Sequence, residues 1–268
     1  MTVLYSPPVD PGLLSRALEV GGRLANDAAE VISATADRGC RVDPAIRSHP
    51  FDWVTDTGRT LERHTRRVLA AEFPDIAVAG AQYEPPVPSG SEFRWVVAPL
   101  DGTANYLAGL PWFSYSLALL DSAGPVVGVI SNPSQAEVYA AARGRGTRVN
   151  GVPVRISEQA TAHGYPVCVE RGSGHWPTRL IELADAAGCG VRVLGSAALA
   201  ISQVALGHAV AAVLEDYREW DVAAGLALAL EAGAVVLDRD GRPDPLPANG
   251  ALVAAPAAAD EVLSWWGA

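Results

Sequence analysis

The first part of the chain carries a helical pattern of apolar positions. From Pro11 onward, small and apolar residues recur at alternating spacings of four and three, which places them on one face of a long helix. These residues are Leu14, Leu18, Gly21, Ala25, Ala28 and Ile32. A second helix is predicted from about Thr57 to Glu72, because Pro74 stops it.

The middle of the chain is predicted to be mostly sheet. Short apolar runs of strand length, separated by Gly and Pro turns, occupy residues 76–79, 93–98, 115–120, 126–130 and 137–142. After Ser157 the pattern changes, and strand-like runs such as PVCVE and VRVL alternate with helical runs such as PTRLIELADAAG and SAALAISQVALG. This alternation predicts a sheet with crossover helices.

These patterns predict an α/β (or α+β) chain without a linker. An N-terminal lobe, residues 1–157, would hold a helix pair and an antiparallel-rich sheet, and a C-terminal α/β lobe would span residues 158–268. The chain has 268 residues, of which 49% are hydrophobic, and is long enough to bury a large core across both lobes. We therefore expect one continuous unit.

Composition excludes several classes of function. The net charge of −10 argues against a nucleic-acid partner, since such a protein needs a basic stripe to neutralise phosphates. All 20 positive side chains are arginine, so Schiff-base, pyridoxal-phosphate and P-loop lysine chemistry are excluded. No stretch resembles a leader or a membrane span, and we expect a cytoplasmic protein that does not bind membranes.

The cysteines do not indicate a metal or disulfide framework. Cys40, Cys168 and Cys189 lie far apart and form no CxxC pair. We expect reduced thiols, with buried apolar surroundings.

Four short stretches place acids or hydroxyls where elements are predicted to begin or end: residues 52–55, 101–105, 195–198 and 220–225. Taken singly, each has an ordinary structural explanation. Asp101 with Gly102 is typical of a turn, Thr103 and Ser196 are typical helix N-caps, and Asp221 is a typical acid in a first helical turn. Their order and spacing together are more specific.

The stretch VVAPLDGTANY resembles the WxxDPxDGTxNF signature of the inositol monophosphatase family of magnesium-dependent phosphomonoesterases. Other stretches agree in order: SHPFDWVT resembles the DxVTxxD motif, RGRGTRVNG the glycine-rich hairpin, GSAALA the GSAA helix start, and EWDVAAGLALALEAG the WDxAAG helix. The similarity runs from about residue 12 to residue 265. It implies a five-layered αβαβα sandwich, a homodimer, and a small phosphate ester bound between magnesium ions.

The resemblance also implies site residues. Backbone N–H groups of Gly102 and Thr103, with Ala104, would cradle the phosphate, and Asp52 with Thr103 would orient the attacking water. Gly195 and Ser196 at the GSAA start are further substrate-binding candidates. The remaining candidates are Glu215 as a polyol contact, His49 near Asp52, and His175 in the loop ERGSGHWP.

The chain departs from the family at positions that bind metal. Ala98 replaces the acid of the signature that bridges two metals, Ala81 falls in the GEE motif, and Gly58 replaces the closing acid of DxVTxxD. Asp101 and Asp221 remain from the second metal site, and the carbonyl of Leu100 remains from the first.

Each lost carboxylate weakens a metal site substantially. A unit charge pair at ~4 Å with an effective dielectric near ~20 contributes ~4 kcal/mol, or about three decades in binding constant. We therefore expect no cofactor, or one Mg²⁺ ion weakly bound at Asp101 and Asp221. Glu84 and Glu92 are alternative metal ligands. However, Pro85 and Pro86 restrict the backbone of Glu84, and Glu92 is expected at the end of its strand opposite to the signature acids.

Three hypotheses of function follow. Without cations, the clustered Asp52, Asp101 and Asp221 cannot all ionise easily, so at least one pKa is expected to rise. The first hypothesis is a repurposed, metal-independent biosynthetic enzyme that uses these acids for elimination, cyclisation or hydrolysis of a small molecule. The second is a weak one-metal phosphomonoesterase for a sugar, polyol or nucleotide phosphate. The third is a non-catalytic protein that binds a ligand or partner.

Overall fold

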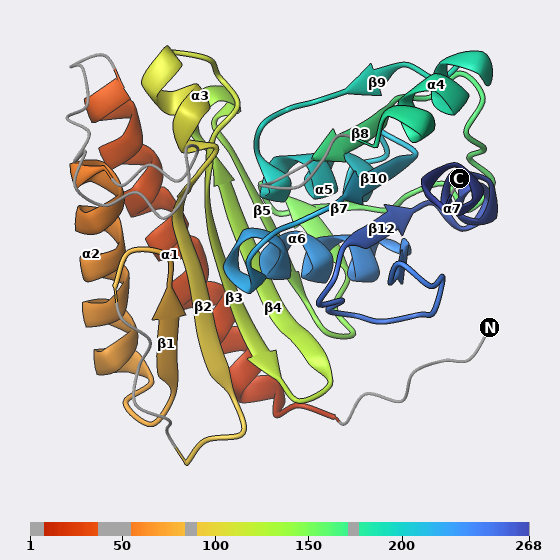
Figure 1. Ribbon diagram of the computed structural model, residues 1–268. Helices are drawn as coiled ribbons and strands as arrows, with labels where there is room; N and C mark the ends of the chain where they lie inside the picture. Colours follow the sequence, from red (N-terminus) through yellow and green to blue (C-terminus); the bar gives the residue numbers. More distant parts are fainter. Residues whose placement is uncertain (1–7, 37–54, 84–89, 171–176, 268) are drawn as a thin grey trace.

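The computed structural model describes residues 8–36, 55–83, 90–170 and 177–267. Figure 1 shows two sheets with helices on their outer faces and between them. This is the αβαβα order of layers that the resemblance implied, and the α/β class is confirmed. No helix within the described ranges is long and apolar enough to cross a membrane.

The first outer layer is a helix pair, α1 (Pro11–Ala36) and α2 (Asp56–Glu72). α1 begins at Pro11 as predicted, and α2 agrees with the predicted range from about Thr57 to Glu72. Thr55 caps α2 by accepting a hydrogen bond from the N–H of Gly58 at 3.0 Å. Leu14, Ala25, Ala28 and Ile32 of α1 are buried against the first sheet, as the helical pattern requires.

The described part of the first sheet has the strand order β1-β2-β3-β4-β5-β6-β7. Its strands are β1 (Ala77–Gly80), β2 (Arg94–Asp101), β3 (Ser114–Asp121), β4 (Gly124–Asn132), β5 (Glu137–Ala142), β6 (Thr147–Val149) and β7 (Val152–Val154). β1 is parallel to β2, and all the following pairs are antiparallel. Two short helices, α3 (Thr103–Ala108) and η1 (Pro133–Gln135), follow β2 and β4.

The second sheet has the described order β11-β12-β10-β8-β9. Its strands are β8 (Val167–Glu170), β9 (Val191–Arg192), β10 (Ala211–Leu214), β11 (Val235–Leu237) and β12 (Ala251–Ala254). β8 is parallel to β9 and β10, as the alternation of strand and helix predicted. The helices of this half are α4 (Thr178–Ala186), α5 (Ala197–Ala205), α6 (Glu219–Ala232), η2 (Pro256–Ala258) and α7 (Ala259–Trp266).

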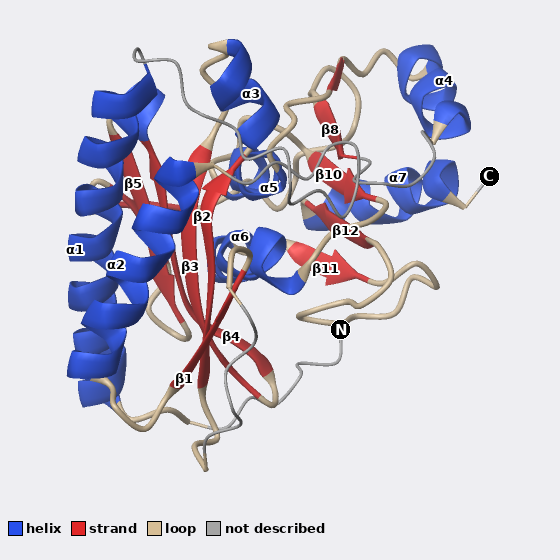
Figure 2. Ribbon diagram, turned by 60° about the vertical axis from the view of Figure 1, so that its left-hand side comes forward, coloured by secondary structure: helices blue, strands red, loops and turns tan. Residues whose placement is uncertain are grey.

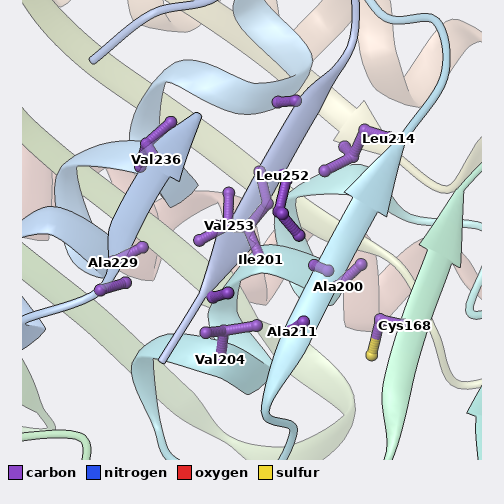
Figure 3. Close-up of a cluster of buried hydrophobic side chains, with 14 of the residues drawn as sticks. Cys168, Ala200, Ile201, Val204, Ala211, Leu214, Ala229, Val236, Leu252 and Val253 are labelled. Carbon is purple, nitrogen blue, oxygen red and sulfur yellow. The ribbon is translucent and has the colours of Figure 1, made fainter. Parts of the chain in front are cut away.

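Helices α5 and α6 form the layer between the two sheets, and α4 and α7 cover the outer face of the second sheet (Figures 1 and 2). α6 lies very close to β4, since a Cβ on Gly128 would be 2.5 Å from the carbonyl oxygen of Ala224. On the opposite side of this helical layer, α5 packs against the second sheet. There Ile201 and Val204 of α5 contact Ala211 and Leu252 (Figure 3). One hydrophobic cluster therefore contains residues of both sheets. The predicted boundary between two lobes after residue 157 stays a prediction.

Strand β9 is shorter than the predicted run VRVL. It ends at Arg192, before Val193 and Leu194. The N–H of Leu194 donates to the side chain of Glu170, and its carbonyl accepts from the side chain of Asn105. Because both peptide groups bond to side chains, Leu194 leaves the sheet and enters the site described below.

Candidate active site

Asp101 ends β2, and the backbone turns sharply after it. The pairing of β2 with β3 is irregular between Ala98 and Asp101, and Asp101 is then opposite Ser114. Gly102 caps α3 with φ of 74°, and a Cβ there would be 2.5 Å from the carbonyl oxygen of Trp112. Only glycine fits this turn without strain or a clash, which explains the Asp-Gly pair.

The Asp101 carboxylate is bonded by the start of α5, which comes from the other half of the chain. The hydroxyl of Ser196 and the N–H of Ala198 both donate to Oδ2, the latter at 3.1 Å. Ser196 Oγ in turn accepts from the N–H of Leu199 at 3.2 Å and so caps α5. Burial raises the pKa of Asp101 to about 6, although the bonds from Ser196 and Ala198 favour the ionised form.

The predicted rise in a pKa of the site is thus found at Asp101, but its main cause differs from the one expected. Burial is the largest effect, whereas the sequence reasoning invoked repulsion between clustered carboxylates. Among the described residues, Glu170 is a carboxyl whose pKa is raised by the charge of Asp101, and sequence reasoning did not select it.

Glu170 ends β8 and is only 8% exposed. Its Oε1 accepts from the N–H groups of Leu194 and Gly195 at 2.7 and 3.0 Å. Burial, with a further contribution from the charge of Asp101, raises its pKa to about 7. One sequence signal pointed to it: Glu170 is the last residue of a predicted strand in the alternating region, and carboxyl ends of parallel strands meet at one edge of a sheet.

The first turn of α3 is fixed by two polar side chains. Thr103 donates its hydroxyl hydrogen to the carbonyl of Leu100 at 2.8 Å, so both predicted residues lie together. Asn105 donates to the carbonyls of Trp112 and Leu194, each at 2.7 Å. The structure therefore brings Leu100, Thr103, Asp101 and Ser196 into one region, while Ala104 is exposed on the same turn.

Two of the three positions that depart from the family lie in well-packed surroundings. Ala98 is 3% exposed and is opposite Ser116, whose hydroxyl has no hydrogen-bond partner among the described residues. A Cβ on Gly58 would be 3.7 Å from Oε1 of Gln82, a buried amide oxygen that likewise lacks a described partner. Gly58 thus lies beside Gln82, which follows the exposed Ala81.

Two other predicted residues carry bonds of their own. Oδ2 of Asp221, in the first turn of α6, accepts from the N–H of Arg218 at 2.8 Å. The carboxylate of Glu215 accepts from Nε1 of Trp266 at 2.6 Å and pairs with Arg239. The metal role of Asp221 and the polyol contact of Glu215 both stay predictions.

The remaining alternatives are only partly covered by the structure. Glu92 is exposed and precedes β2, at the opposite end of the strand from Asp101. Asp52, His49, His175 and Glu84 lie outside the described residues, and their roles stay predictions. Within the described ranges, no three His, Cys, Asp or Glu side chains gather closely enough to hold a metal ion.

Known proteins share both the sequence pattern and the fold. The model of the inositol monophosphatase family matches residues 14–264. An inositol-1-monophosphatase of Rhizobium meliloti is 36% identical over 209 residues, which cover 75% of this chain and 77% of the relative. The Nus factor SuhB of Pasteurella multocida is 30% identical over 254 residues, covering 92% of this chain and 94% of the relative.

The solved structure of the extragenic suppressor protein suhB from Bartonella henselae superposes with a TM-score of 0.86. It is 26% identical, and the match covers 93% of this chain and 98% of that chain.

Proposed function

Since this chain belongs to the inositol monophosphatase family, we propose that it is a repurposed enzyme of that family. It acts on a small phosphorylated or polyhydroxylated molecule, with Asp101 as the group that gives and takes a proton. The reaction is an elimination, a cyclisation or a hydrolysis, each of which a positioned carboxyl can assist. In this proposal the chemistry at Asp101 does not depend on a pair of magnesium ions.

The hydrogen bonds of Asp101 carry this proposal. Oδ2 accepts from the Ser196 hydroxyl and the Ala198 N–H, so this oxygen is already bonded by protein donors. The donors come from the cap and first turn of α5, where the helix dipole favours a negative charge. These bonds fix the orientation of the Asp101 carboxyl and influence its pKa, and proton transfer depends on both.

The neighbouring donor set supports a site that works without paired metals. Hard dications prefer several carboxylate oxygens. Ala98 offers none, and the oxygen of Gln82 beside Gly58 is neutral. The Leu100 carbonyl accepts from Thr103, and Asp221 accepts from Arg218. We infer from this donor set that the chain does not hold a two-metal centre, and no step of the proposed chemistry passes through one.

A second candidate is a weak phosphomonoesterase that uses one Mg²⁺ ion. The names of the relatives favour it, since those of Rhizobium meliloti and Mesorhizobium japonicum are called inositol-1-monophosphatases. Asp101 and Asp221 both remain in this chain and would be the ligands of the Mg²⁺ ion.

The homodimer and the cytoplasmic location also stay predictions. Light scattering on the purified protein tests whether it is a dimer.

Phosphate release separates the two candidates. The purified protein is incubated with inositol 1-phosphate, a hexose phosphate and a nucleotide, in excess Mg²⁺ or in chelator, beside Asp101→Asn. We expect no magnesium-dependent release from any of them. Robust magnesium-dependent release that disappears in Asp101→Asn would overturn the proposal in favour of the one-metal phosphatase.

Binding in chelator tests whether there is a working pocket. Thermal unfolding is followed with a panel of polyols and polyol phosphates and no free metal. We expect at least one compound to stabilise the wild-type chain but not Asp101→Asn. Lack of stabilisation throughout the panel would contradict a metal-free site and favour a partner-binding protein.

A further inference from the structure

One short segment, Leu194 to Ala198, is held from both halves of the molecule. From the first half, Asn105 of α3 donates to the carbonyl of Leu194 at 2.7 Å. From the second half, Glu170 at the end of β8 accepts from the N–H of the same residue, also at 2.7 Å. Both peptide groups that flank the Leu194 Cα are therefore fixed by side chains.

Glu170 is a buried acid whose carboxylate is bonded to the backbone of one turn. Its carboxylate is bonded by backbone N–H groups, from Leu194 at 2.7 Å and from Gly195 at 3.0 and 3.2 Å. A buried carboxylate is unfavourable unless donors replace its lost water, and here these donors belong to a single turn. Gly195 has φ of 70°, and a Cβ on it would be 2.8 Å from Nδ2 of Asn105, so the turn requires glycine.

The residues immediately after this turn are the ones that bond Asp101. Ser196 follows Gly195 directly and donates its hydroxyl hydrogen to Asp101, while Ala198 donates its N–H at 3.1 Å. Moving the Gly195 peptide would move both donors, because they lie one and three residues further along the chain. Glu170 is thus linked to Asp101 through the backbone of the turn.

We propose that Glu170 is a positioning residue, whose carboxylate holds the turn at Leu194 and Gly195 so that Ser196 and Ala198 are aimed at Asp101. Its importance for a reaction rests on the proposed function of Asp101. The alignment itself is a property of the free protein. It can therefore be measured without substrate or metal, and its failure is distinguishable from a failure of the proposed function.

The chain offers a matched control in Glu231 of α6. Its carboxylate accepts from the N–H groups of Gly144 and Gly146, each at 2.8 Å, and so also holds a glycine turn. This turn joins β5 to β6, whereas the donors to Asp101 are Ser196 and Ala198 at the start of α5. Glu231→Gln therefore makes the same chemical change at a different turn.

The test compares Glu170→Ala, Glu170→Gln and Glu231→Gln by amide hydrogen exchange and by the amide proton shift of Ala198. We expect Glu170→Ala to exchange the Ala198 amide about 10-fold faster or more, and its signal to move upfield as the bond to Asp101 lengthens. Glu170→Gln should give a smaller change of the same sign, because one oxygen at the Oε1 position still accepts from Leu194 and Gly195. Glu231→Gln should leave Ala198 unchanged.

The graded rescue separates positioning from a general loss of stability. Melting temperatures of all three variants are measured, and each exchange rate is compared at an equal margin below its own transition. If Glu170→Ala does not fold, the Ala198 amide is compared between Glu170→Gln and Glu231→Gln alone, and this comparison still decides the question. An Ala198 amide that is unaffected by either Glu170 variant, or equally affected by Glu231→Gln, would overturn the proposal.

Discussion

Replacing Ser196 with alanine removes the single hydroxyl that links Asp101 to α5. Ser196 Oγ donates to Oδ2 of Asp101 and accepts from the N–H of Leu199 at 3.2 Å. The substitution therefore deletes an N-cap and a hydrogen bond to a carboxylate together. The two losses depend differently on pH, which allows them to be separated.

The cap contributes about 1 kcal/mol at any pH. The bond to an ionised carboxylate contributes about 1.5–3 kcal/mol, against about 1 kcal/mol for a neutral acceptor. Because one pKa unit corresponds to about 1.4 kcal/mol, the pKa of Asp101 should rise by about one unit in Ser196→Ala. Its value in the wild-type fold is about 6, already raised from 3.8.

The sign of the effect follows from the raised pKa. The folded state holds the Asp101 proton more tightly than the unfolded state, so stability falls as pH rises through the folded pKa. In Ser196→Ala this fall continues to a higher pH. The variant should lose about 2 kcal/mol near pH 5, where Asp101 is mostly protonated, and about 3–4 kcal/mol near pH 8.

Urea denaturation at both pH values measures these losses. Ser202→Ala is the matched control, since Ser202 lies in the same helix and donates to a neutral acceptor, the carbonyl of Ala198 at 2.7 Å, instead of to the Asp101 carboxylate. Its loss should be the same at both pH values. Equal losses for Ser196→Ala near pH 5 and pH 8 would refute the charge-assisted bond.

Three further perturbations test the arrangement. Gly195→Ala should lower the free energy of unfolding by about 2–3 kcal/mol in urea denaturation, because φ is 70° and a Cβ would clash with Asn105. A loss near zero would contradict this description of the turn. Gly128→Ala should lose about 3 kcal/mol by separating β4 from α6, where its Cβ would be 2.5 Å from the Ala224 carbonyl, yet leave the Ala198 amide signal unchanged. The pKa of Glu170 in the folded state is about 7, above its ordinary 4.5. The stability of the wild type should therefore fall as pH rises from 4.5 to 7, and Glu170→Gln should flatten that fall. An unchanged slope of stability against pH in Glu170→Gln would contradict the raised pKa.

Much of the fold was predictable because it follows from apolar spacing. The helix from Pro11 buries the face that its periodicity selects, except that Leu18 is only partly buried, and the strands of the first sheet follow the short apolar runs. The run VRVL was assigned wholly to a strand, although the strand ends at Arg192. Leu194 bonds instead to Glu170 and Asn105, and such distant side-chain contacts leave no local pattern in the sequence.

The site was predictable where motif residues meet one another. Asp101, Thr103 and Ser196 were selected from the sequence, and the structure places them together with the carbonyl of Leu100. Glu170 was missed because it lies outside the motif stretches and is linked to the donors of Asp101 through the turn at Gly195. Glu215 was selected by resemblance, and its bonds to Trp266 and Arg239 arise from α7 and the β11–β12 connection.

Magnesium titration by calorimetry tests most directly whether Asp101 works without paired metals. The wild-type chain is compared with the variant that carries Ala81→Glu and Ala98→Asp, each first shown to be folded. We expect no binding tighter than about 1 mM in the wild type, and at least about 1,000-fold tighter binding in the variant, since one restored carboxylate contributes ~4 kcal/mol. Sub-millimolar binding of two Mg²⁺ ions by the wild-type chain would contradict the metal-independent site.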